Sequence, residues 1–228
     1  MPPLRRHQLA LVTADGWKDV LRRAWNAPIN AGLSHWAAQG LPVVVTRQLP
    51  PPTNTTGRIA LGVSLPETWG RQRVALQLMP SQLSMFTEFP TLTASLGVLP
   101  AVERKAVRDL AASLAARDLQ ARVYGSVGWQ ALTGLPYLHD QSDIDLWLAV
   151  DDEHAADAAV ELLQQVAGIR RRVDGELVFR DGTAVAWREW AAWRQGRCQR
   201  LLAKHLYGHE LRQGVTGGES LVPWEMTT

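Results

Sequence analysis

The sequence predicts an α+β protein in two parts, and three observations lead to this fold class. The chain has 228 residues, 46% hydrophobic and 20% charged, so it is long enough to fold around one large or two modest cores. Proline and glycine divide the first hundred residues into short apolar pieces, whereas helical and strand patterns alternate in the second half. We therefore expect a mixed α/β domain over residues 1–98 and an α+β domain over residues 99–228.

One helix and three strands are expected in the first part. Apolar residues recur at helical spacing from Trp17 to Trp25, with Asp15 as a possible N-cap and Pro28 beyond the end. The strands are short β-branched or alternating runs between prolines and glycines, at residues 41–46, 59–65 and 74–79.

The second part is expected to alternate between helices and strands. An amphipathic pattern begins after Pro100 and predicts a helix over residues 101–119. Apolar runs then alternate with helical patterns up to a final hairpin. The expected order is a strand at 121–124, a helix at 127–132, a strand at 144–150, a helix at 154–166, and hairpin strands at 176–179 and 183–187.

Charge and cysteine content exclude several classes of protein. Lys and Arg number 24 and Asp and Glu 22, and the formal charge of +2 is too small to predict nucleic acid or an anionic membrane as a partner. A single cysteine, Cys198, rules out an internal disulfide framework. The apolar run at residues 9–12 is too short for a signal peptide, and no stretch approaches the ~20 apolar residues of a membrane span. We therefore expect a cytoplasmic protein.

The residues that point to chemistry are two aspartates and a Gly-Ser pair. Asp143 and Asp145 alternate along a predicted strand, so both side chains lie on one face. Their mutual repulsion favours a divalent cation, and Mg²⁺ is the usual choice when carboxylates and a polyphosphate share the ligand sphere. Gly125 and Ser126 lie between a predicted strand and a predicted helix, where a phosphate can approach the backbone and bind the helix N–H groups. Because an Asp-x-Asp pair alone is common on exposed strands, the hypothesis depends on the combination.

Together these four residues resemble the signature of the nucleotidyltransferase superfamily, a Gly-Ser at the start of a helix and an acidic pair on the next strand. The resemblance implies a nucleotidyltransferase-like core in the second part, with Asp143 and Asp145 as catalytic residues and metal ligands. The segment between the two motifs, residues 127–142, has 16 residues, somewhat more than is usual in that superfamily.

A narrower family accounts for the longer segment. The stretches concerned are 125–137 (GSVGWQALTGLPY), 142–146 (SDIDL), 175–178 (GELV), 184–189 (AVAWRE) and 202–204 (LAK), with looser matches at 41–45 and 62–66. They resemble the phosphoribosyl-dephospho-CoA transferase of malonate decarboxylase, also called malonate decarboxylase holo-acyl-carrier-protein synthase. The resemblance implies that a serine of the decarboxylase acyl-carrier subunit attacks the α-phosphate of triphosphoribosyl-dephospho-CoA, and that pyrophosphate leaves.

Sites of this kind generally have a third carboxylate on a neighbouring strand, which binds metal or accepts the proton of the attacking hydroxyl. Glu189 and Glu176 both lie in stretches that match the family, and each is equally explained as a solvated charge of the hairpin. We favour Glu189, because it follows the apolar run 184–187 within a Trp-Arg-Glu stretch.

The residues expected to bind the substrate are Gly125, Ser126 and Lys204. Lysine is rare in this chain, and Lys204 ends an apolar run from which its ammonium group can reach a phosphate or extend into solvent. The arginines at residues 170–172 are either a contact for an acidic carrier or a solvated feature of a helix C-terminus.

Two other functions are weighed against this one. The first is a nucleotidyltransferase that uses a nucleoside triphosphate on another acceptor, and the second is a catalytically inactive scaffold. Retention of Asp143 and Asp145 together with Gly125 and Ser126 argues against an inactive scaffold. The spacing of the histidines predicts no structural zinc.

Overall fold

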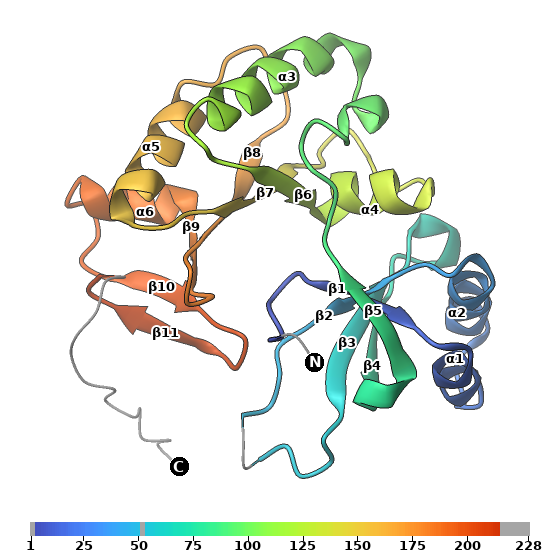
Figure 1. Cartoon of the computed structure of the whole chain (residues 1–228). Helices are drawn as coiled ribbons and strands as arrows, with labels where there is room; N and C mark the ends of the chain where they lie inside the picture. Colours follow the sequence, from blue (N-terminus) through green and yellow to red (C-terminus); the bar gives the residue numbers. More distant parts are fainter. Residues whose placement is uncertain (1–2, 51–52, 215–228) are drawn as a thin grey trace.

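A computed structural model describes residues 3–50 and 53–214 of the chain. Two β-sheets dominate it, one formed by residues before 90 and the other by residues after 120 (Figure 1). Residues 215–228 of the expected second domain lie outside the described residues, and the expected boundary at residues 98 and 99 stays a prediction. Within the two described ranges, no helix is long and apolar enough to cross a membrane.

The N-terminal sheet has five antiparallel strands in the order β4-β3-β2-β1-β5. Two helices lie against one of its faces (Figure 1). The elements are β1 (Leu9–Val12), α1 (Ala14–Leu21), α2 (Ala27–Gln39), β2 (Val43–Val45), β3 (Ile59–Ser64), β4 (Arg73–Leu78) and β5 (Leu83–Thr87), with 3₁₀ turns at Glu67–Trp69, Pro80–Gln82 and Leu96–Val98.

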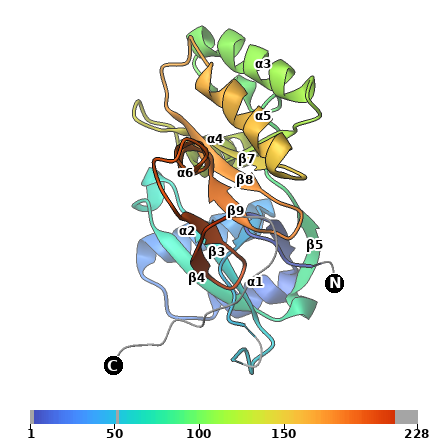
Figure 2. The ribbon, with the colours of Figure 1, turned by 90° about the vertical axis from the view of Figure 1, so that its left-hand side faces the viewer.

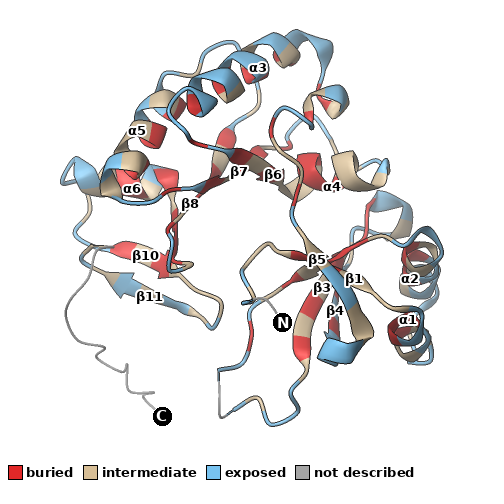
Figure 3. Cartoon of the chain, viewed as in Figure 1, coloured by how far each residue is buried: buried red, intermediate tan, exposed pale blue. Residues whose placement is uncertain are grey.

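Alternation along β3 and β4 gives this sheet two different faces. Leu61 and Leu76 belong to the buried set, which packs with Trp17 of α1 and Trp36 of α2. The residues between them are half-buried or exposed, and they face the C-terminal part of the chain (Figure 3). One face of the sheet is therefore core, and the other is available to a ligand.

Several elements of this part differ from those predicted from the sequence. The first helix ends at Leu21, and its N-cap is Thr13, whose hydroxyl oxygen accepts from the N–H of Gly16, whereas Asp15 is exposed and pairs with Lys18. Pro28 does not follow a helix but lies in the first turn of α2, where its missing N–H costs no helical hydrogen bond. Neither α2 nor the strands β1 and β5 were expected.

The C-terminal sheet has six strands in the order β11-β10-β9-β8-β7-β6, and only the pair β7 and β8 is parallel. Helices α3, α5 and α6 cover one face of it (Figures 1 and 2). The elements are α3 (Ala101–Ala115), β6 (Ala121–Tyr124), α4 (Gly125–Thr133), β7 (Ile144–Ala149), α5 (Glu153–Gln164), β8 (Val173–Val178), β9 (Ala184–Ala186), α6 (Trp187–Arg194), β10 (Leu201–Lys204) and β11 (His209–Arg212). The expected α+β class is confirmed.

One expectation about the end of this part was wrong, and one hairpin was not expected. Trp187 does not end a hairpin strand but begins α6, so Glu189 is a helical residue. Residues 201–204 form strand β10, whose hairpin with β11 extends the sheet. Residues 187–194 form a helix because their apolar side chains recur at helical spacing. Trp187, Trp190 and Ala191 lie on one face of α6 and pack into the core, and this packing outweighs the strand pattern of the residues before them.

The core of the C-terminal part sits between its sheet and its helices. In β7, Ile144, Leu146 and Leu148 are buried under the helices, whereas Asp145 and Trp147 point to the opposite face. That opposite face looks towards the N-terminal sheet (Figure 1). The acidic residue in the middle of β7 is thereby presented to the space between the two parts.

Candidate active site

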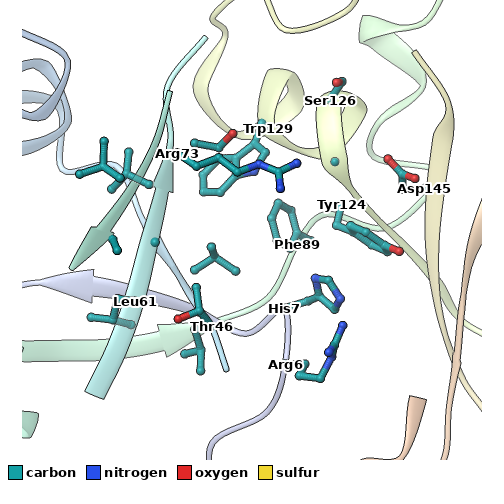
Figure 4. A pocket seen from close by; sticks show the side chains of 18 of the residues that line it. Arg6, His7, Thr46, Leu61, Arg73, Phe89, Tyr124, Ser126, Trp129 and Asp145 are labelled. Atoms are coloured by element: carbon teal, nitrogen blue, oxygen red, sulfur yellow. The ribbon is translucent and has the colours of Figure 1, made fainter. Parts of the chain in front are cut away.

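A pocket of about 760 Å³ lies between the open face of the N-terminal sheet and the C-terminal part (Figure 4). One wall comes from β2, β3 and β4, and the other from β6, the start of α4 and β7. Both charged and apolar side chains line the pocket, among them those of Arg6, His7, Val44, Arg47, Gly62, Ser64, Arg73, Ala75, Phe89, Tyr124, Gly125, Ser126, Trp129, Tyr137 and Asp145.

The Gly-Ser pair forms the first turn of α4, directly after β6. Gly125 has φ +60°, and a Cβ at this position would lie 2.0 Å from Oδ2 of Asp145. No side chain in the described part of the chain caps the helix, so its first N–H groups are available to a ligand. Glycine is required here both by the backbone conformation and by the closeness of the carboxylate.

The two aspartates of the acidic motif lie as expected, on one face at the start of β7. Asp143 precedes the strand, and Asp145 is its second residue and pairs in register with Tyr124 of β6. Figure 4 shows the Asp145 carboxylate next to the α4 turn that carries Ser126. The Gly125 and Ser126 turn and the acidic pair therefore meet at one end of the pocket.

A third carboxylate, Asp174, lies beside this pair. Asp174 of β8 is the register partner of Asp145 in the parallel pair of strands. Arg172 connects the group, since its Nη2 lies 2.6 Å from Oδ2 of Asp143 and 3.0 Å from Oδ2 of Asp174. Burial, and then the charges of Asp143 and Asp174, raise the pKa of Asp145 to about 6.

The donor set fits a magnesium ion that is shared with a substrate. In the part of the chain that the structure describes, no three side chains already surround a common metal position. Mg²⁺, however, is usually held by one or two carboxylates together with substrate phosphates. A cationic guanidinium already bridges two carboxylates here, and Asp145 is part-buried beside the negative charges of Asp143 and Asp174, so a further cation would be stabilised at this place. Asp143 and Asp145 are the residues that would hold the ion.

Glu189 is not brought to this cluster. Its carboxylate Oε1 accepts a hydrogen bond of 2.6 Å from the backbone N–H of Leu202, so it connects α6 to β10. Asp143 and Asp174, and not Glu189, are the acidic groups that shift the pKa of Asp145 most. The geometry thus favours Asp174 over Glu189 as the third carboxylate, although a catalytic role for either stays a prediction.

Glu176 and Lys204 belong to a second charged cluster two residues further along β8. Glu176 is 4% exposed, accepts a hydrogen bond of 2.8 Å from Lys204, and also pairs with Arg6 and His7. Burial raises the pKa of Glu176, but His7, Arg6 and Lys204 overcome this effect and lower it to about 2. The cluster ties the N-terminal segment to the C-terminal sheet, and it holds Lys204 on a carboxylate and not on the pocket wall.

Sequence analysis missed Asp174, Arg172 and the arginines of the N-terminal wall. Asp174 and Glu176 alternate along β8, which is the signal that was available for Asp174, but it was hidden because the strand begins at Val173, earlier than expected. Arg172 was seen only within the cationic run 170–172. Of that run, Arg171 is also used inside the fold, where it pairs with the buried Glu103.

Two models of one protein family match this chain, one in each of its two parts. The family model "Phosphoribosyl-dephospho-CoA transferase MdcG N-terminal domain" matches residues 5–89, and "Phosphoribosyl-dephospho-CoA transferase MdcG C-terminal domain" matches residues 91–214. No solved structure matches the chain, so the nucleotidyltransferase-like character of its core stays a prediction.

Curated relatives match over most of their length. A phosphoribosyl-dephospho-CoA transferase of Xanthomonas campestris pv. campestris (strain 8004) is 37% identical over 207 residues, which are 90% of this chain and 92% of the relative. One of Bradyrhizobium diazoefficiens is 32% identical over 225 residues, 94% of this chain and 95% of the relative. One of Pseudomonas aeruginosa is 35% identical over 172 residues, 72% and 74% of the two chains.

The fold, the carboxylate cluster beside an uncapped helix and these matches define a transferase of the α+β class. More narrowly, the chain belongs to the phosphoribosyl-dephospho-CoA transferase family.

Proposed function

We propose that this protein transfers the phosphoribosyl-dephospho-CoA group from triphosphoribosyl-dephospho-CoA to a serine of the malonate decarboxylase acyl-carrier subunit, releasing pyrophosphate. Membership of the family supports the reaction. The observation that carries it is the position of Asp145 against the uncapped first turn of α4, with Asp143 and Asp174 beside Asp145. In-line displacement at a phosphate needs this combination of carboxylates for a cation and N–H groups for phosphate oxygens.

In this proposal, different residues bind the phosphates, hold the metal ion and accept the proton. The N–H groups at the start of α4 and the hydroxyl of Ser126 bind phosphate oxygens of the substrate. Asp143 and Asp145 would hold Mg²⁺, which when bound would neutralise charge on the phosphates. The serine oxygen of the carrier bonds to the α-phosphorus, the bond from that phosphorus to the bridging oxygen of the β-phosphate breaks, and Asp174 accepts the serine proton.

Arginines at the rim of the site suit a carrier with an acidic surface. Arg172 and Arg188 are exposed and stand beside Asp174. Once a cation occupies the carboxylates, Arg172 is free to meet an acidic group of the carrier. The proposal includes a cytoplasmic location, which the lack of a disulfide framework supports.

Mass spectrometry of the carrier subunit tests the function. The carrier is mixed with the protein, Mg²⁺ and either triphosphoribosyl-dephospho-CoA or ATP. We expect the mass of the carrier to rise by the phosphoribosyl-dephospho-CoA group only in the first mixture, and to stay unchanged when Asp145→Asn replaces the wild type. Modification from ATP would establish a general nucleotidyltransferase, and no modification in either mixture would favour the inactive scaffold.

A further inference from the structure

The N-terminal wall of the pocket carries a row of small side chains across three strands. Val44 of β2 pairs in register with Gly62 of β3, which pairs with Ala75 of β4. All three line the pocket, on the face of the sheet that is turned away from α1 and α2. A Cβ at Gly62 would already lie 3.1 Å from Cγ2 of Thr46, so the absence of a side chain at Gly62 leaves space for a ligand at this part of the wall. The row forms a shallow apolar floor.

Two arginines border this floor, and their charges are not neutralised. Arg47 and Arg73 line the pocket, and neither side chain makes an ion pair or hydrogen bond within residues 3–50 and 53–214. The pocket's other arginine, Arg6, is paired with Glu176. Figure 4 shows the Arg73 side chain extending from β4 into the pocket. These unpaired guanidinium groups suit a phosphate or diphosphate, which arginine binds with paired N–H groups.

The two walls of the pocket are fixed to each other. The hydroxyl of Tyr137 donates a hydrogen bond of 2.5 Å to the carbonyl of Ser64 at the end of β3. Trp129 of α4 packs edge to face on Phe89, with ring centroids 5.3 Å apart, and both belong to the N-terminal core. A ligand that contacts the arginines on one side and the α4 turn on the other therefore meets one continuous site.

We propose that the Val44, Gly62 and Ala75 floor, with Arg73 and Arg47 at its border, binds the dephospho-CoA portion of the substrate: the floor takes its organic arm and the arginines take its diphosphate. This inference rests on the proposed function. The catalytic end of the pocket binds the triphosphate chain, which ATP shares, whereas the N-terminal wall recognises the portion that ATP lacks. The N-terminal sheet thus determines which triphosphate compound is used.

Calorimetric titration with dephospho-CoA itself is the test, because this probe needs neither carrier nor reaction. Arg73→Gln removes the charge, and Ala75→Leu raises the floor at an exposed position where a larger side chain does not disturb the core. The matched controls are Arg71→Gln, which removes an equal charge from an exposed ion pair with Glu67, and Gln77→Leu, two residues further along the same face of β4 and outside the pocket lining. Thermal melts of all four variants verify that they are folded.

We expect Arg73→Gln to raise the Kd of dephospho-CoA about tenfold or more, because it removes charged hydrogen bonds to the diphosphate. Ala75→Leu should raise this Kd by a similar factor, because the leucine occupies the space above the floor. The controls should stay within about twofold. The inference is overturned if the wild type shows no detectable binding of dephospho-CoA. It is also overturned if each variant has the same Kd as its control, that is, Arg73→Gln the same as Arg71→Gln and Ala75→Leu the same as Gln77→Leu. Failure of the proposed function is seen separately, as a carrier that the wild type does not modify in the mass-spectrometric assay.

Discussion

Asp145 and Asp174 are register partners on the parallel strands β7 and β8, so their side chains lie side by side on one face of the sheet, and Arg172 pairs with both Asp174 and Asp143. If this cluster is the catalytic centre, Asp143→Asn or Asp145→Asn should abolish transfer, because each removes charge that would hold a cation on the substrate phosphates. Asp174→Asn should lower the transfer rate by about 10²- to 10⁴-fold, because an amide cannot accept the proton of the carrier serine. The measurement is single-turnover modification of the carrier at saturating Mg²⁺, with a thermal melt of each variant.

Glu189→Gln provides the contrast to Asp174→Asn. The amide oxygen of glutamine can still accept from the N–H of Leu202, so the connection between α6 and β10 is kept. We expect a normal transfer rate and a stability within about 0.5 kcal/mol of the wild type. A normal Asp174 variant beside a Glu189 variant slowed by orders of magnitude would return the third carboxylate to Glu189.

Arg172 should compete with a metal ion for the carboxylates. Because its guanidinium already bridges Asp143 and Asp174, Arg172→Gln leaves the cluster more negative and should tighten Mg²⁺ binding. An exposed pair is worth about 0.2–1 kcal/mol, so the gain in Mg²⁺ affinity should be about fivefold at most. The readout is the Mg²⁺ concentration that gives half of the maximal rise in Tm.

Arg180→Gln is the control for Arg172→Gln, because Arg180 makes an exposed ion pair with Asp151 away from the pocket. Its half-maximal Mg²⁺ concentration should equal that of the wild type. Weaker Mg²⁺ binding by the Arg172 variant would contradict the competition.

Glu176 should contribute to stability and not to chemistry. Glu176→Gln leaves Lys204 and Arg6 without their buried counter-charge, and removing one partner of a buried pair costs about 3–5 kcal/mol. The pKa of Glu176 is about 2 in the folded chain, below its ordinary value of 4.5. Its stabilising effect is therefore complete above about pH 4.5 and is lost as the pH falls towards 2.

Urea unfolding at pH 7 and at pH 3 measures this effect. The wild type should exceed Glu176→Gln clearly at pH 7, and the difference should shrink at pH 3. Glu210→Gln, in a partly exposed cluster with His205 and Arg212, should change stability far less. A difference between wild type and Glu176→Gln that grows on acidification would show that the carboxylate is not held ionised.

Local patterns in the sequence were sufficient for part of the fold and site. The Gly-Ser turn and the Asp-x-Asp pair are each contained in a few residues, and the alternation of β7 is visible in the sequence itself. Asp174 is brought to Asp145 by a parallel strand pair across the intervening helix α5, and the register of such a pair is set by packing and not by local sequence. The pocket wall depends likewise on the pairing of Val44, Gly62 and Ala75 from three strands.

The start of α2 and the strand β1 were not predicted because they too depend on contacts between distant or neighbouring elements. Pro28 fits both after a helix and in the first turn of the next one, and only the cap made by Asn26 on the N–H of Ile29 decides between them. The four residues of β1 form a strand because β2 and β5 pair with them on both sides. Both features depend on contacts that a short window of sequence does not contain.

Gly125 begins α4 and Gly134 follows it, so a comparison of the two positions isolates the role of the turn that is proposed to bind phosphate. Both have positive φ, +60° and +70°, so alanine at either position should cost about 1–2 kcal/mol of stability. A Cβ at Gly134 meets nothing within 4 Å, whereas one at Gly125 would lie 2.0 Å from Oδ2 of Asp145. We therefore expect Gly134→Ala to lose stability alone, and Gly125→Ala to lose transfer activity as well because the Asp145 carboxylate is displaced. Thermal melts together with single-turnover carrier modification separate the two effects, and equal rates in the two variants would show that the Gly125 turn is structural only.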